Sequence, residues 1–139
     1  LFSVWIQHLA ANATGPDYSS VCIFRGKNDA AEILELTPIE ASASVHHLSQ
    51  LISLYNQGVN FPLLLPPETS RAFVAQLQSP KPELALTKAL ETWDLDLVNA
   101  DGKDRVWRRL FSLPDDLNAH FRDNAILMWQ PLFDQLART

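Results

Sequence analysis

An apolar segment bracketed by prolines constrains this chain more than any other feature, because it dictates where one helix ends and the next begins. Residues 61–66 read Phe-Pro-Leu-Leu-Leu-Pro, with Gly58 before them and Pro67 directly after. Glycine readily takes the left-handed conformation that closes a helix, and proline is favoured at the first position of one. The segment therefore predicts a helix that ends at Gln57 and another that opens at Pro66–Pro67.

The composition is that of one globular domain. The chain has 139 residues, 47% of them hydrophobic and 19% charged, which is enough to bury one core. Its formal net charge of −5 gives no overall cationic field for a phosphate backbone, so any nucleic-acid role must be local or shared. The single cysteine, Cys22, cannot form an internal disulfide, and no signal peptide or membrane-length apolar run is present. We expect a soluble, cytoplasmic protein with no membrane partner.

Hydrophobic periodicity predicts helix over most of the chain. Apolar residues at helical spacing from Phe2 to Leu9 place the start of the chain inside an amphipathic helix without a cap, which suggests a piece of a longer protein. Residues 37–40 read Thr-Pro-Ile-Glu, a reciprocal capping motif that predicts a second helix over 38–57. Further helices are expected from 66–67 to a break at 79–82, around 86–93, over 106–111, and from 114 to 136 with a kink at 131.

Two short β-branched or aromatic runs predict an antiparallel hairpin. Residues 21–24 and 33–36 are the expected strands, and the turn residues 26–29 lie between them. Because an isolated hairpin is marginal in water, it needs a helix or further strands against it. The predicted fold class is therefore α+β, mostly helical, with five to six helices and one small hairpin, in a single domain over residues 1–139.

Few residues suit catalysis or metal binding. His46 and His47 are neighbours that point about 100° apart on a helix, so one metal ion cannot take both without other ligands. His8 and His120 are isolated, and the apolar neighbours of Cys22 predict a small core residue. We predict no catalytic residue, no metal ligand and no cofactor-binding residue.

One triplet permits a different hypothesis, an active metal-dependent nuclease. Such nucleases of the restriction-enzyme type place an acid on one strand and an acid-x-Lys motif on the next. Only Asp101-Gly102-Lys103 matches that motif. It lies between predicted helices, where the needs of a turn explain both Asp and Gly, and we favour that structural interpretation.

Two groups of residues are candidates for DNA or partner contact. Arginines interleaved with a tryptophan can hold phosphate and stack on bases, although a core-facing tryptophan with solvated arginines is the simpler interpretation, which we favour. The proline-bracketed segment is too apolar for a free loop, so either the domain's own helices, which we favour, or another subunit must cover it. The candidate contacts are Arg105, Trp107, Arg108, Arg109, Phe61 and Pro62.

Four blocks in one order resemble the C-terminal region of the gamma subunit (RecC) of exodeoxyribonuclease V. The first block is residues 1–15 with Trp-Ile-Gln-His-Leu at 5–9, and the second is residues 54–70. The third comprises residues 89–93 and 104–111, and the fourth runs from Phe121 to Leu136. Together the blocks cover essentially the whole chain.

The resemblance implies a noncatalytic role. It implies that residues 1–139 are the C-terminal part of an inactive, restriction-endonuclease-like domain of a larger chain. That chain would act as scaffold, subunit contact and DNA-end handler in a helicase-nuclease complex (RecBCD) for double-strand-break repair by recombination. Its implied partners are RecB-type and RecD-type subunits, with DNA reached through the assembled complex and Mg and ATP bound by the partners. An active nuclease domain and a freestanding adaptor module are the alternatives.

Overall fold

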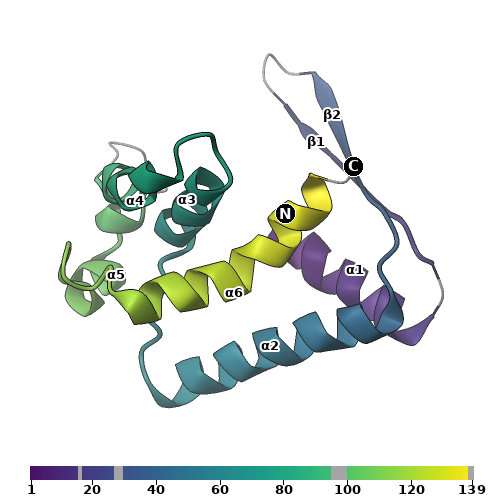
Figure 1. Ribbon diagram of the computed structural model, residues 1–139, viewed down its shortest axis with the longest axis horizontal. Helices are drawn as coiled ribbons and strands as arrows, with labels where there is room; N and C mark the ends of the chain where they lie inside the picture. The colour runs from purple at the N-terminus through teal and green to yellow at the C-terminus, as the bar shows by residue number, and fades with distance from the viewer. Residues whose placement is uncertain (16, 27–29, 95–99, 138–139) are drawn as a thin grey trace. The chain divides into compact units, whose positions relative to one another are not determined.

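The computed structural model describes residues 1–15, 17–26, 30–94 and 100–137 (Figure 1). Within these ranges it has six α-helices, two 3-10 helices and one two-stranded antiparallel sheet, so the predicted mostly helical α+β class is confirmed. The elements are α1 Phe2–Thr14, β1 Ser20–Arg25, β2 Ala31–Leu36, α2 Ala41–Asn60, α3 Pro67–Leu77, η2 Pro82–Leu84, α4 Ala85–Trp93, η3 Asp101–Lys103, α5 Arg105–Leu110 and α6 Ala119–Leu136.

Contacts divide the chain into two compact units. The first unit is Leu1–Ser53 with Pro131–Thr139, and the second is Leu54–Gln130. This division does not test the prediction of a single domain over residues 1–139, which stays a prediction. None of the helices in the described part of the chain has the length and apolar character of a membrane span.

In the first unit, α1 packs with both apolar and polar side chains. Its buried residues are Trp5, His8, Leu9 and Asn12, at the spacing of one helix face. The helix predicted at the start of the chain is therefore confirmed, and it continues to Thr14. Asn12 links the helix to Tyr18, because its side chain donates to the Tyr18 carbonyl at 2.9 Å and accepts from the Tyr18 amide at 3.1 Å.

His8 connects α1 to the segments on either side of the hairpin. Its Nε2 lies 3.0 Å from the Thr37 carbonyl oxygen, and its Nδ1 lies 2.8 Å from Ser20 Oγ. Since a carbonyl only accepts hydrogen bonds, Nε2 carries the proton, and Nδ1 accepts from the serine hydroxyl. The buried ring is therefore satisfied as a neutral imidazole. Burial lowers the pKa of His8, and the hydrogen bond to Thr37 opposes that shift.

The predicted hairpin is confirmed. Strands β1 and β2 pair in antiparallel register with Ile23 opposite Ile33, while turn residues 27–29 lie outside the described residues. Leu36, at the end of β2, is fully buried. Most of the rest of the hairpin is exposed, with Ile23 at 68% and Ile33 at 70% of their accessible surface.

Helix α2 starts three residues later than the capping motif predicts, at Ala41 instead of Pro38. Thr37, the predicted cap, is engaged elsewhere: its Oγ1 accepts from Gln135 Nε2 at 2.8 Å and its carbonyl accepts from the same amide at 2.7 Å. Glu40 supplies the first helical carbonyl instead. A tertiary contact with α6 thus overrides the local capping signal.

The same helix also ends later than predicted. It passes through Gly58 to Asn60, so the expected glycine stop at Gln57 is wrong. No glycine in the described ranges has a positive φ, and the Phe61 amide still donates to the Gln57 carbonyl at 2.9 Å. Asn60 helps to end the helix, because its side-chain amide satisfies the Asn56 carbonyl at 2.8 Å.

In the second unit, the predicted helices α3, α4 and α5 are confirmed, and an aromatic cluster joins them to α6. Phe121 lies 5.6 Å from Phe73 of α3 and 6.4 Å from Phe111, between ring centroids. Helix α6 starts at Ala119, later than the expected residue 114, because the Asn118 side chain accepts from the Phe121 amide and acts as the N-cap. The helix then continues through Pro131.

The state of His8 predicts how stability depends on pH. Because the folded state lowers the His8 pKa below its ordinary value of about 6.5, the unfolded chain binds the proton more readily. Stability is then fully present above that pH and falls as the pH drops below it. Urea unfolding between pH 7.5 and 5 should show this loss, and His8→Gln should reduce the slope. His120→Gln is the matched control, and a slope unchanged by His8→Gln would contradict the prediction.

Candidate functional site

A cleft in the second unit is lined by both the acid-x-Lys triplet and the tryptophan of the arginine cluster. Its volume is about 550 Å³. Its lining residues are Pro67, Glu68, Ala100, Asp101, Lys103, Asp104 and Trp107. Three carboxylates, an ammonium group and an indole around one cleft are the strongest candidate for chemistry among the described residues, so the state of each acid decides what the cleft can do.

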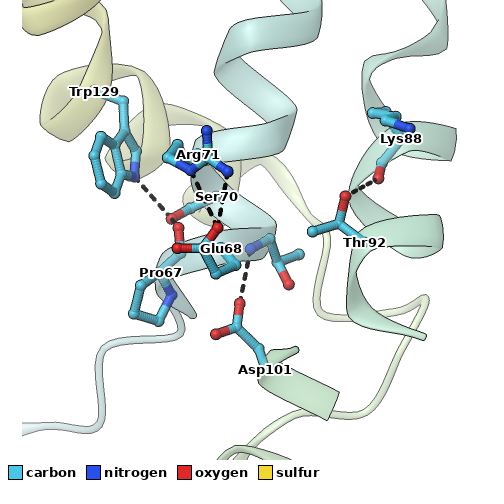
Figure 2. Close-up of polar contacts among 9 residues, drawn as sticks. Pro67, Glu68, Ser70, Arg71, Lys88, Thr92, Asp101 and Trp129 are labelled. Atoms are coloured by element: carbon cyan, nitrogen blue, oxygen red, sulfur yellow. Dashed lines mark hydrogen bonds and ion pairs between the residues drawn. The ribbon is translucent and has the colours of Figure 1, made fainter. Parts of the chain in front are cut away.

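Asp101 acts as a cap for α3. Its Oδ2 accepts a hydrogen bond from the Thr69 amide at 2.7 Å, in the first turn of the helix, and Figure 2 shows the carboxylate directed at that turn. The N-cap position itself is Pro66, whose side chain offers no acceptor. Asp101, 32 residues along the chain from Thr69, therefore provides the hydrogen-bond acceptor that a Ser or Asp at the N-cap would normally provide. Its negative charge also interacts favourably with the positive end of the helix dipole.

Burial is the main influence on this carboxyl group. Asp101 is only 6% exposed, and its burial raises the pKa above the usual aspartate range. The hydrogen bonds from Thr69 oppose the shift, and the neighbouring negative charge of Glu68 adds to it. The raised pKa thus follows mainly from the burial of Asp101 in its structural role.

The other two acids of the cleft also have structural partners. Glu68 Oε2 accepts from Arg71 Nη2 at 2.9 Å and from Arg71 Nε at 3.2 Å (Figure 2). Asp104 Oδ1 accepts from the Val106 amide at 2.7 Å and caps α5. In the part of the chain that the structure describes, no group of three or more His, Cys, Asp or Glu residues is arranged to hold a metal ion.

The triplet itself has a structural explanation. Asp101-Gly102-Lys103 forms the 3-10 helix η3, whereas the nuclease motif requires a strand. A Cβ atom on Gly102 would collide with the backbone carbonyl oxygen of Trp93, at the end of α4. Glycine is therefore needed here because two backbone segments approach closely.

The arginine cluster does not form one stacking surface with its tryptophan. Arg105, Arg108 and Arg109 are exposed, and their spacing places them on one face of α5. Trp107 falls on the opposite side, half-buried, lining the cleft and packing edge-on against Phe111 at 6.1 Å. Within the described residues, none of these three guanidinium groups makes a hydrogen bond or an ion pair. They therefore form a small local cationic face.

The proline-bracketed segment is covered at one end only. Pro66 is buried and residues 63–65 are half-buried, so the favoured coverage by the chain's own helices holds there. Phe61 is 76% exposed and Pro62 is also exposed, which overturns that interpretation for these two residues. Both therefore remain available to a partner.

Sequence reasoning missed a buried polar contact beside the cleft. Trp129 of α6 donates its indole N–H to Ser70 Oγ at 2.9 Å, and Ser70 in turn donates to the Pro67 carbonyl (Figure 2). The contact joins residues 59 apart in sequence. No local pattern could have revealed it, because a buried indole needs a partner without specifying which one.

Comparisons with known proteins agree with the resemblance seen in the sequence. The family model described as RecC C-terminal domain matches residues 1–78. The RecBCD enzyme subunit RecC of Escherichia coli (strain K12) is 28% identical over 122 residues, which cover 77% of this chain and 10% of that protein. The chain thus spans about a tenth of the length of the curated relative it matches.

The cap formed by Asp101 can be tested by substitution. Asp101→Ala leaves the buried Thr69 amide unpaired and should lower the free energy of unfolding by about 1–2 kcal/mol in urea titrations. Asp101→Asn keeps an acceptor and removes the buried charge, so it should be close to wild type at neutral pH. An Asp101→Ala variant as stable as wild type would show that the carboxylate is not a cap.

Proposed function

The chain belongs to the RecC C-terminal domain family, and from this membership we propose that it is a noncatalytic part of the gamma subunit of an exodeoxyribonuclease V (RecBCD-type) complex. The family match over more than half of the chain is the observation that carries the proposal. In this role it provides scaffold, subunit contacts and DNA-end handling during double-strand-break repair in the cytoplasm. RecB-type and RecD-type subunits are its partners, and they bind the Mg and ATP.

The engaged carboxylates support the noncatalytic part of the proposal. A metal-dependent nuclease needs acids that are free to hold a cation and a lysine that orients water. Here Asp101 caps α3, Asp104 caps α5 and Glu68 pairs with Arg71. Recruiting these acids for metal would uncap two helices, so the cleft suits stability better than hydrolysis.

Exposed apolar side chains support the subunit-contact part. Phe61 and the hairpin pair Ile23 and Ile33 are each more than two thirds exposed. Scattered single apolar residues are ordinary on a surface, but a cross-strand pair of isoleucines forms a contiguous patch. Such patches are typical of chains that function within an assembly.

Assembly and cleavage together test the function. The chain, co-expressed with RecB-type and RecD-type subunits, should co-purify with them as a stoichiometric complex. Purified alone with linear DNA and magnesium, it should cut no DNA, because its cleft acids have structural partners. Lys103→Ala should leave nuclease activity of the complex unchanged. Magnesium-dependent cutting by the chain alone that Lys103→Ala abolishes would establish the active-nuclease alternative, and failure to co-purify would favour a freestanding adaptor.

The cationic face of α5 should contribute weakly to DNA binding. If Arg105, Arg108 and Arg109 contact phosphates, replacing all three with Ala should weaken binding to single-stranded DNA and reduce the slope of log affinity against log salt by about 2. Fluorescence anisotropy over a salt series measures both. The matched control removes equal charge elsewhere, through Arg71, Lys81 and Lys88. Affinity retained after the α5 substitutions would remove these arginines from DNA handling.

A further inference from the structure

Residues 37–40 connect β2 to α2 without forming helix, although their sequence is that of a helix start (Figure 1). They read Thr-Pro-Ile-Glu, with a capping threonine, a proline suited to the first helical position and a glutamate three residues after the threonine. In the structure Glu40 takes the cap position instead, because its carbonyl accepts a hydrogen bond from the Ser44 amide at 2.9 Å. The chain therefore contains two possible starts for α2, at Pro38 and at Ala41.

One side chain opposes the earlier start. Gln135, near the end of α6 and in the same unit as Thr37, donates from Nε2 to both Thr37 oxygens, to the hydroxyl at 2.8 Å and to the carbonyl at 2.7 Å. A helix that starts at Pro38 requires the same two oxygens. The hydroxyl of an N-cap threonine accepts from the amide three residues later, and its carbonyl accepts from the amide four residues later. Gln135 and the longer helix therefore compete for one residue.

The exchange between these two arrangements conserves the hydrogen bonds of Thr37. If Gln135 withdraws, the Glu40 amide can take the hydroxyl, and the Ala41 amide can take the lone pair that Gln135 leaves on the carbonyl. The other lone pair stays available to His8, whose Nε2 donates to this carbonyl at 3.0 Å. The longer helix thus does not require His8 to lose its partner.

Little buried surface resists the added turn. Pro38 and Glu40 are exposed, and Ile39 is half-buried. The Ile39 amide donates to Asn12 Oδ1 at the long distance of 3.4 Å, whereas the same oxygen accepts from the Tyr18 amide at 3.1 Å. Asn12 therefore keeps a partner when Ile39 moves.

The added turn has hydrogen bonds of its own. In the present helix the amides of Ala41, Ser42 and Ala43 have no intrahelical acceptor, as in the first turn of any helix. When α2 starts at Pro38, these three amides donate to the carbonyls of residues 37–39. They therefore report directly on which start is used.

We propose that Thr37 is a conformational switch, in which Gln135 holds α2 in its shorter form and displacement of the end of α6 lets α2 extend to Pro38. A helical residue rises about 1.5 Å and an extended one about 3.3 Å, so winding three residues shortens the connection to β2 by up to about 5 Å. The added turn draws the hairpin and the start of α2 together. The switch couples the end of α6 to the exposed pair Ile23 and Ile33, and it does not rest on the proposed function.

Amide hydrogen exchange followed by NMR tests the switch. Gln135→Leu keeps an apolar side chain at a buried position and removes both hydrogen bonds to Thr37. In the full chain it should slow exchange at residues 41–43 about tenfold, because a turn wound for about 90% of the time exposes these amides only in the remaining tenth. The amides of α3 should change by less than about twofold. Unchanged exchange at residues 41–43 in the folded variant overturns the proposal.

A second substitution shows whether Thr37 caps the added turn. Thr37→Val keeps the shape of the side chain and removes the hydroxyl, and loss of an N-cap shifts a helix equilibrium about fivefold. In the Gln135→Leu background it should therefore reduce the slowing at residues 41–43 from about tenfold to about threefold. Slowing that stays tenfold would mean that another group ends the helix, which also overturns the switch at Thr37.

The wild-type chain offers a measurement that does not depend on whether a variant folds. NMR relaxation dispersion at residues 39–43 should show a minor state with helical chemical shifts, since microsecond-to-millisecond exchange is visible to this method. A minor state of this kind supports the switch even if Gln135→Leu does not fold. Its absence, combined with a Gln135→Leu variant that does not fold, overturns the proposal.

Discussion

The first unit depends on one backbone acceptor, the carbonyl oxygen of Thr37. It receives a hydrogen bond from His8 of α1 and another from Gln135 of α6, so two helices from opposite ends of the chain meet at the residue that follows β2. Both donors are buried, and a buried donor without a partner is costly. Because the hairpin is otherwise largely exposed, it is attached by this junction, by the buried Leu36 and by the hydrogen bond from Ser20 of β1 to His8. The same junction occupies Thr37 and thereby delays the start of α2.

Most elements of the fold were predictable because their signals are local. The spacing of apolar residues in α1, the alternation and turn residues of the hairpin, and the proline at the start of α3 each act within a few residues. The two errors have different causes. Thr37 fails as a cap because Gln135 takes its hydroxyl, and α2 passes through Gly58 because glycine permits the left-handed conformation without requiring it. A local motif indicates which backbone conformations are favourable, and tertiary contacts can determine which of them is adopted.

The candidate site was less predictable, for the same physical reason. The acid-x-Lys triplet is visible in the sequence, and so is its turn character, but nothing near Asp101 indicates that its carboxylate caps a helix 32 residues earlier. Likewise, the arginines of α5 share a face as their spacing requires, whereas the burial of Trp107 on the other side depends on Phe111 and the cleft. Spacing predicts which residues share a face of one element. It does not predict which face another element covers.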